Sequence, residues 1–137
     1  MYWEGGYCYV YSIYGLHHCV NVVTGPKDSG AAVLIRAVEP LQGLQFMRRR
    51  RPGANRCELT NGPAKLCQAL AITKSYWGLD LLTSKRIRLT PFRTFSAAEI
   101  GCSTRIGISK AAAYPWRFFV KESPWVSTPQ QRLKTGK

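Results

Sequence analysis

The sequence predicts an α+β fold: a single compact mixed domain with a short-stranded curved sheet, a protruding β-hairpin and a few helices. Two strand-like segments separated by a tight turn predict the hairpin, and short strand patterns interspersed with helix signals predict the mixed class. The length of 137 residues fits one domain, and a hydrophobic content of 45% fits a chain with a packed core.

The hairpin is predicted in residues 7–23. Tyr7, Tyr9 and Tyr11 alternate, which places their rings on one face of a strand. Tyr14-Gly15 breaks the alternation, and the β-branched run from His18 to Val23 supplies the return strand. A row of rings on a hairpin suits a wedge that opens a nucleic-acid duplex. An ordinary core hairpin explains the same pattern, and these residues alone favour it.

The remaining elements follow from turn and helix signals. Pro63 at a first helical position, after Asn61 or Gly62 as cap, predicts a helix with an apolar stripe. Arg36 is unusual because a charge inside an apolar strand needs a partner if it is buried. The full prediction is a turn at 24–30, strands at 31–39, 86–89 and 104–109, and helices at 41–51 and 61–70. Two further apolar segments, 116–120 and 125–127, close the apolar pattern.

The charge balance predicts a polyanionic partner. The chain has 20 Lys and Arg against 7 Asp and Glu, a formal net charge of +13, and nucleic acid is the simplest partner for such a surface. The four arginines Arg48–Arg51 fit a solvated face, a phosphate contact or, more weakly, a nuclear signal. The helix start beside Lys65 offers free N–H groups to a phosphate.

The cysteines and the N-terminus narrow the class of protein. The five cysteines are odd in number and no two are spaced as zinc ligands, so we expect reduced, mostly buried thiols and no metal. Met1 is not followed by a basic segment and an apolar core, so no signal peptide is expected. The longest uncharged stretch carries Asn21 and two histidines, which makes it a poor membrane span.

A series of motifs occurs at residues 9–11, 14–19, 21–23, 33–37, 39–43, 61–70, 105–108 and 115–120, among them YGLHHC, NGPAKLCQAL and PWRFFV. In these motifs and their order, the chain resembles the alkyladenine (3-methyladenine) DNA glycosylase family. The likeness extends from Met1 to about Ser127. It implies an intracellular, monomeric base-excision repair enzyme that flips alkylated or deaminated purines out of double-stranded DNA and hydrolyses their N-glycosidic bond, without a metal or other cofactor.

The resemblance also implies roles for individual residues. Tyr14 and Leu16 would enter the minor groove, Tyr11 would stack on the extruded base and Asn21 would lie at the pocket floor. Arg36 would lie beside the catalytic carboxylate, which explains a charge in an apolar strand. The implied contacts to phosphate or other DNA groups are His17, Gly62, Lys65, Arg117 and Ser127.

The sequence departs from the family at the general base. The family carries that glutamate in a Thr-Glu-Ala-Tyr motif upstream of the hairpin, and no Thr-Glu pair occurs in this sequence. Met1–Gly6 resembles the segment just before the first hairpin strand, so Glu4 does not inherit the role, and Glu39 matches a structural position. We therefore expect a glycosylase-like domain at 1–127 that lacks its N-terminal part, and a basic tail at 128–137.

Two functions remain open from the sequence. The first is a glycosylase whose sequence begins at an internal methionine. The second is a catalytically inactive DNA-binding remnant of the family, which keeps the wedge but cannot activate water.

Overall fold

The computed structural model describes residues 1–107 and 111–126. Its helices and short antiparallel strands confirm the predicted α+β class. In chain order the elements are β1 (Cys8–Ile13), β2 (His17–Thr24), β3 (Ala31–Leu34), α1 (Leu44–Arg50), η1 (Cys57–Leu59), α2 (Pro63–Ala69), η2 (Lys74–Tyr76), β4 (Ile100–Ser103) and β5 (Arg117–Val120), where η marks a 3₁₀ helix.

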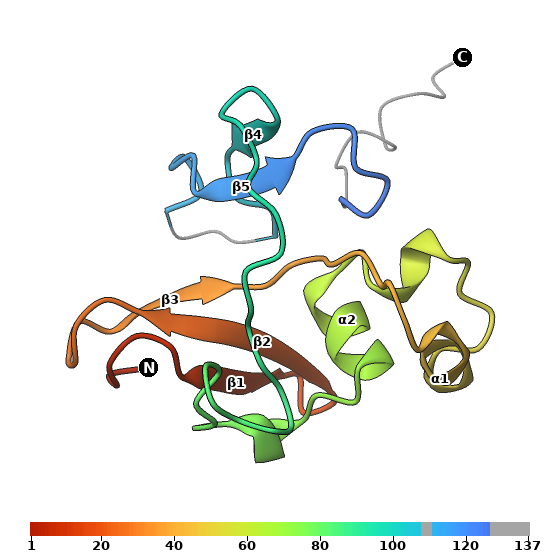
Figure 1. The fold of residues 1–137 in the computed structure, drawn as a ribbon, viewed down its shortest axis with the longest axis horizontal. Coiled ribbons are helices and arrows are strands. Elements are labelled where there is room, and N and C mark those ends of the chain that lie inside the picture. Colours follow the sequence, from red (N-terminus) through yellow and green to blue (C-terminus); the bar gives the residue numbers. More distant parts are fainter. Residues whose placement is uncertain (108–110, 127–137) are drawn as a thin grey trace.

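The predicted hairpin is confirmed as β1 and β2, which pair antiparallel with Tyr9 opposite Asn21 and Tyr11 opposite Cys19. β3 pairs antiparallel with the far edge of β2, so the sheet has the order β1-β2-β3 (Figure 1). The turn predicted at 24–30 connects β2 to β3. Because register fixes the face of every side chain, Tyr9, Tyr11, Cys19 and Asn21 share one face of the hairpin.

The opposite face of the hairpin forms the core with α2. Cys8, Val10 and Val20 pack there against Leu66 and Cys67 in one buried cluster. The predicted cap of α2 is confirmed in part: Gly62 is the N-cap residue in an extended conformation and Pro63 follows at the helix start, but no side chain caps the helix. The sheet therefore has a core face toward α2 and a second face that carries the tyrosines.

The arginine run forms the end of α1 and contributes to packing. Arg50 donates a hydrogen bond to the Ala69 carbonyl oxygen at 2.9 Å, and Arg51 donates to Gln68 Oε1 at 2.6 Å. Gln68 Nε2 in turn donates to the Arg50 carbonyl oxygen at 3.1 Å. Arg50 and Arg51 thus join α1 to α2, while Arg48 and Arg49 are exposed on the helix surface.

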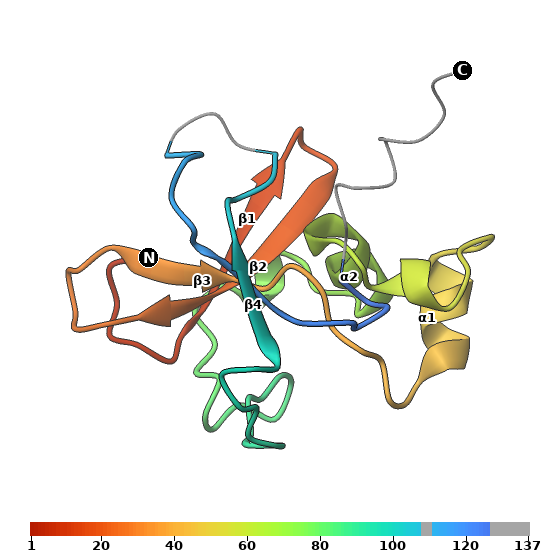
Figure 2. The same cartoon turned by 90° about the horizontal axis from the view of Figure 1, so that it is seen from above.

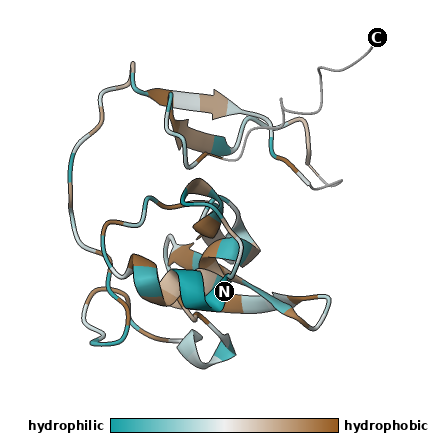
Figure 3. Ribbon diagram, turned by 90° about the vertical axis from the view of Figure 1, so that its right-hand side faces the viewer, coloured by the Kyte–Doolittle hydropathy of each residue, from teal (hydrophilic) through white to brown (hydrophobic). Residues whose placement is uncertain are grey.

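β4 and β5 form a separate two-stranded ribbon with Gly101 opposite Phe119. Figures 1 and 3 show this ribbon apart from the helices and joined to them by a long irregular segment, and Figure 2 shows it from above. A Cβ atom at Gly101 would lie 2.5 Å from the Phe119 ring, so the close pairing of the two strands requires glycine there.

Three predicted strands need correction. The strand predicted at 31–39 ends at Leu34, because Val38 instead exchanges hydrogen bonds with Thr60, whose hydroxyl donates to the Val38 carbonyl oxygen at 2.6 Å. The strand predicted at 86–89 is wrong: Arg86 lies over the Tyr76 ring at 4.4 Å and holds the segment against η2. The strand predicted at 104–109 is also wrong over 104–107, since β4 ends at Ser103, and its last two residues lie outside the described part.

The described helices are short. In residues 1–107 and 111–126, none is both long and apolar enough to cross a lipid bilayer.

Candidate functional site

The tip of the β1–β2 hairpin is a tight turn closed by a hydrogen bond from the Leu16 N–H to the Ile13 carbonyl oxygen at 3.3 Å. Its two central residues, Tyr14 and Gly15, have φ angles of 52° and 69°. Two left-handed residues in succession are typical of the hairpin turn that matches strand twist, and this turn normally has Asn or Gly at both places. A tyrosine at the first of these two positions therefore strains the backbone.

The side chains at this tip are unusually exposed. Tyr14 is 92% exposed and Leu16 is 81% exposed. An aromatic ring and a leucine projecting into water contribute little to the core, and the left-handed backbone at Tyr14 costs stability. The tip therefore exposes two apolar side chains that the packing of the core does not require.

One face of the hairpin behind the tip carries a small cluster of aromatic and polar groups. The rings of Tyr9 and Tyr11 lie 5.9 Å apart between centroids. Asn21 is only 6% exposed, and its side-chain amide donates a hydrogen bond to the Tyr9 carbonyl oxygen at 3.2 Å. The amide is thus both a satisfied sheet residue and a fixed polar group on the face that carries Tyr11.

Charge interactions place Arg36 and Arg117 at this same cluster. Burial, followed by the neighbouring Cys19 thiol, raises the pKa of Tyr11, while the Arg36 guanidinium acts to lower it. Burial raises the pKa of Cys19, again opposed in part by Arg36. Burial and the like charge of Arg36 lower the pKa of Arg117 on β5. The structure therefore brings Tyr11, Cys19, Arg36 and Arg117 together between the sheet and the ribbon.

Arg36 is poorly satisfied at this position. Its Nε atom is buried without a hydrogen-bond partner, and no ion pair joins Arg36 to a carboxylate within the described residues. A guanidinium in such surroundings favours a negatively charged group beside it. The partner that the sequence analysis expected for a buried Arg36 is not found among the described residues.

The residues expected to contact phosphate lie at different places. His17 begins β2 next to the tip and is exposed. Gly62 and Lys65 belong to the start of α2, on the other side of the sheet from Tyr11, and Lys65 Nζ donates to Asn61 Oδ1 at 3.0 Å. Arg117 is buried beside Arg36, which separates it from these surface residues. Ser127 lies outside the described residues.

Some features of the site could not be read from the sequence. The strain at Tyr14 depends on the turn type, and the approach of Cys19 to Tyr11 and of Arg117 to Arg36 depends on strand register and on the position of the ribbon. Over the described residues, no group of three or more His, Cys, Asp or Glu side chains is arranged to hold a metal ion.

The hairpin thus combines a strained aromatic tip with a face that carries tyrosines, an amide and nearby arginines. The family model described as methylpurine-DNA glycosylase (MPG) matches residues 1–124. The chain belongs to the methylpurine-DNA glycosylase family.

Curated relatives of this family agree with the match. Proteins named "Putative 3-methyladenine DNA glycosylase" from Natranaerobius thermophilus and Rhodopseudomonas palustris are each 47% identical to the chain, over 93% and 96% of its length. A protein of the same name from Clostridium novyi is 44% identical over 93% of the chain. The aligned part covers 67%, 63% and 67% of these three methylpurine-DNA glycosylase relatives, so the chain spans about two thirds of their length.

Proposed function

We propose that this chain is the DNA-recognising part of a glycosylase that removes alkylated or deaminated purines from double-stranded DNA. The observation that carries the proposal is the exposed, left-handed Tyr14 at the hairpin tip, with Leu16 beside it. An enzyme that acts on a base inside a duplex must extrude it, and a rigid side chain in the gap keeps the base from returning. Tyr14 is placed to insert in this way from the minor groove.

The face behind the tip is suited to hold the extruded purine. Tyr11 offers a ring on which the base stacks, and an alkylated purine carries positive charge, which adds a cation–π attraction of about 1–2 kcal/mol once the pair is desolvated. Asn21 is held by its hydrogen bond to the Tyr9 carbonyl oxygen and forms a rigid floor. A rigid side chain against the C2 edge of the purine disfavours guanine, whose exocyclic amino group would collide or lose its partner.

The reaction is hydrolysis of the N-glycosidic bond. The bond between C1′ and the base nitrogen breaks, the base leaves with the bonding electrons, and water adds to C1′ after losing a proton to a general base. We propose that this base is a carboxylate held beside Arg36, where a buried Nε atom has no partner. Three of the acidic residues are engaged elsewhere: Glu58 with Asn55, Asp80 with Leu82 and Glu99 with Arg93.

DNA binding is supported by the net charge of +13 and by the positions of the cationic residues. We propose that His17, Gly62, Lys65 and Ser127 meet phosphates or sugars on the strands that flank the wedge. Arg117 is buried beside Arg36, and we assign it to the phosphate of the extruded nucleotide. One copy of the domain at residues 1–127 is sufficient for these contacts, so we propose that it acts as a monomer on DNA inside the cell.

The test compares binding and excision by the 137-residue chain on one set of duplexes. Fluorescence anisotropy measures binding to a duplex with hypoxanthine and to the same duplex with adenine, and abasic-site cleavage measures excision. We expect binding with a preference for the hypoxanthine duplex. Equal affinity for both duplexes and for single strands would contradict base extrusion, and no binding at all would contradict the proposed function.

A further inference from the structure

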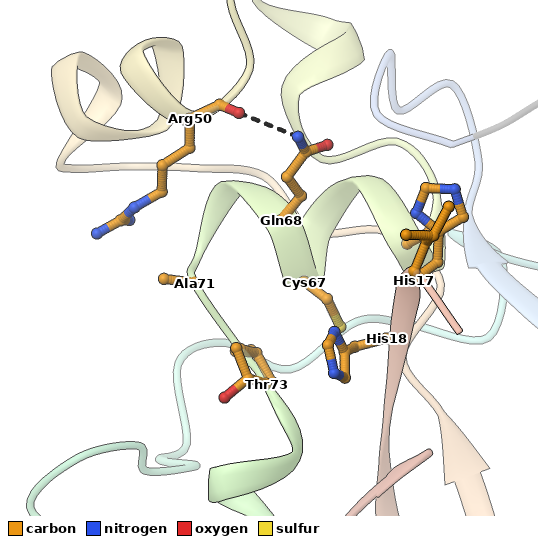
Figure 4. Close-up of a pocket in the computed structure, with 10 residues that line it drawn as sticks. His17, His18, Arg50, Cys67, Gln68, Ala71 and Thr73 are labelled. Carbon is orange, nitrogen blue, oxygen red and sulfur yellow. Dashed lines mark hydrogen bonds between the residues drawn. The ribbon is translucent and has the colours of Figure 1, made fainter. Parts of the chain in front are cut away.

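A cavity of about 410 Å³ opens beside the hairpin tip, and it lies apart from the face that carries Tyr11. Its walls come from Leu16–His18 of the hairpin, Arg50 at the end of α1, α2 and the segment 71–73 after it. Figure 4 shows the His18 ring beside the Cys67 side chain, with Thr73 nearby on the segment that follows α2. This volume is in the range of pockets that bind small molecules or single nucleobases.

The floor of the cavity is apolar and uncharged. Ala64, Cys67 and Ile72 line it, and Cys67 and Ile72 belong to the buried core. Burial raises the pKa of the Cys67 thiol to about 12, so the sulfur is neutral at physiological pH. No aspartate or glutamate lines the cavity, so no negative charge repels a nucleic-acid strand from it.

Most polar groups in the walls are already occupied. Gln68 accepts from Arg51 and donates to the Arg50 carbonyl oxygen, and the Arg50 guanidinium donates to the Ala69 carbonyl oxygen. Thr73 bonds with Ser75. The two imidazoles of His17 and His18 have no hydrogen-bond partner within the described residues. A neutral imidazole offers one donor and one acceptor, so each ring is available to a ligand.

The cavity is continuous with the wedge. Leu16 and His17 line it, and Leu16 is only two residues from Tyr14 at the tip. Tyr11 and His18 point to opposite faces of the hairpin, since Tyr11 is opposite Cys19 and His18 is opposite Ser12 in the register. A duplex held on the wedge therefore has the face of Tyr11 on one side of the gap and the cavity of His18 on the other.

We propose that this cavity binds the base on the complementary strand that loses its partner when the purine is extruded. The inference rests on the proposed function, because it requires the wedge to enter a duplex. The lining favours a base over a phosphate: Arg50 is its only lysine or arginine, and one N–H of that guanidinium already donates to the Ala69 carbonyl oxygen, whereas a phosphate needs several strong donors. An unpaired base instead exposes donors and acceptors on its edge for His18, and an apolar face for the floor.

The test uses 2-aminopurine, whose fluorescence rises when it leaves the base stack. The 137-residue chain is added to a duplex in which 2-aminopurine is opposite a stable abasic analogue, and to a control duplex with 2-aminopurine several base pairs away. We expect a rise for the first duplex and none for the second. Ala64→Leu fills the cavity and should abolish the rise, whereas Ala98→Leu, at an exposed position outside the cavity, should keep it. His18→Ala should also abolish it.

Anisotropy on the same samples separates this inference from the proposed function. If the wild-type chain binds the duplex without a rise in fluorescence, the cavity does not take the base and the inference is overturned. It is also overturned if Ala64→Leu and His18→Ala both bind and both keep the rise. A chain that does not bind duplex DNA contradicts the proposed function itself, and the inference then fails with it.

Discussion

Asn21 and Tyr9 are opposite each other across β1 and β2, and the Asn21 side-chain amide donates a hydrogen bond to the Tyr9 carbonyl oxygen at 3.2 Å. The bond fixes the amide in one orientation on the face that carries Tyr11. A polar side chain that is 6% exposed is thereby satisfied within the sheet. The same bond that stabilises the hairpin also makes the floor of the proposed base pocket rigid.

This relationship predicts a stability cost for Asn21→Ala. The substitution removes a partly buried hydrogen bond and leaves space in the sheet face, so the free energy of unfolding should fall by about 1–3 kcal/mol. Urea unfolding measures it. Ser12→Ala, at an exposed position on the same hairpin, is the control and should change the free energy of unfolding by less than about 0.5 kcal/mol. Equal values for the two variants would show that the Asn21 bond contributes nothing.

The lack of a carboxylate beside Arg36 predicts slow excision by the chain on its own. Its Nε atom lacks a partner and no carboxylate pairs with it among the described residues. A positioned general base typically contributes about 10²–10⁴-fold to the rate, so single-turnover excision of hypoxanthine should be lower by about that factor than in a relative that carries the Thr-Glu motif. A rate equal to that of the relative would show that an acidic residue of this chain acts as the base, with Glu4 as the first to test.

Duplex binding should depend steeply on salt. Each phosphate neutralised by Lys or Arg contributes about −0.9 to the slope of log affinity against log salt concentration. Arg48 and Arg49 are exposed on α1. We expect Arg48→Ala to make the slope less steep by about 0.9, the contribution of one phosphate. Arg93→Ala is the matched control, because Arg93 is already paired with Glu99 at 2.5 Å. A slope near zero in the wild type would exclude phosphate contacts as the basis of binding.

The hairpin and α2 were predicted well because the residues that specify each of them are close together in the sequence. Alternating tyrosines, the Tyr14-Gly15 turn and Pro63 after Gly62 each determine structure within a few residues. The strand predicted at 86–89 failed because Arg86 stacks on Tyr76, ten residues away in the chain. The position of β4 was missed because Gly101 reads as a strand breaker, and its tolerance depends on the Phe119 ring of the partner strand.

The candidate site likewise has some residues whose positions follow from the sequence and others whose positions do not. Tyr11 and Asn21 could be placed on one face from hairpin register, since register follows from the turn. The proximity of Arg36 to Arg117 and the cavity beside the tip could not, because they depend on how the ribbon and α2 pack on the sheet. Such long-range packing has no periodic signal in a single sequence.

Burial of Cys67 predicts loss of stability at alkaline pH. Burial raises the pKa of its thiol from 9.0 to about 12, so the unfolded chain gives up this proton at lower pH than the folded protein. The contribution of the neutral Cys67 thiol to stability is therefore fully present below about pH 9 and is lost as pH rises toward 12. Urea midpoints at about pH 8 and about pH 10.5 should differ less in Cys67→Ala than in the wild type. Cys8 and Cys19 also have a raised pKa and should leave part of the decrease in the variant.

The strained tip predicts that stability and function change in opposite directions at Tyr14. Its φ angle of 52° is one that glycine adopts without penalty, and its ring is 92% exposed, so the side chain contributes little to the core. Tyr14→Gly should therefore keep the free energy of unfolding or raise it by up to about 1 kcal/mol. The same variant lacks the ring that fills the gap, so its preference for the hypoxanthine duplex over the adenine duplex should disappear. Tyr14→Phe keeps the ring and the strain, and should retain both the preference and the wild-type stability. If Tyr14→Gly is less stable than the wild type, the ring supports the hairpin; if it keeps the preference, another side chain at the tip, with Leu16 the nearest, is the wedge.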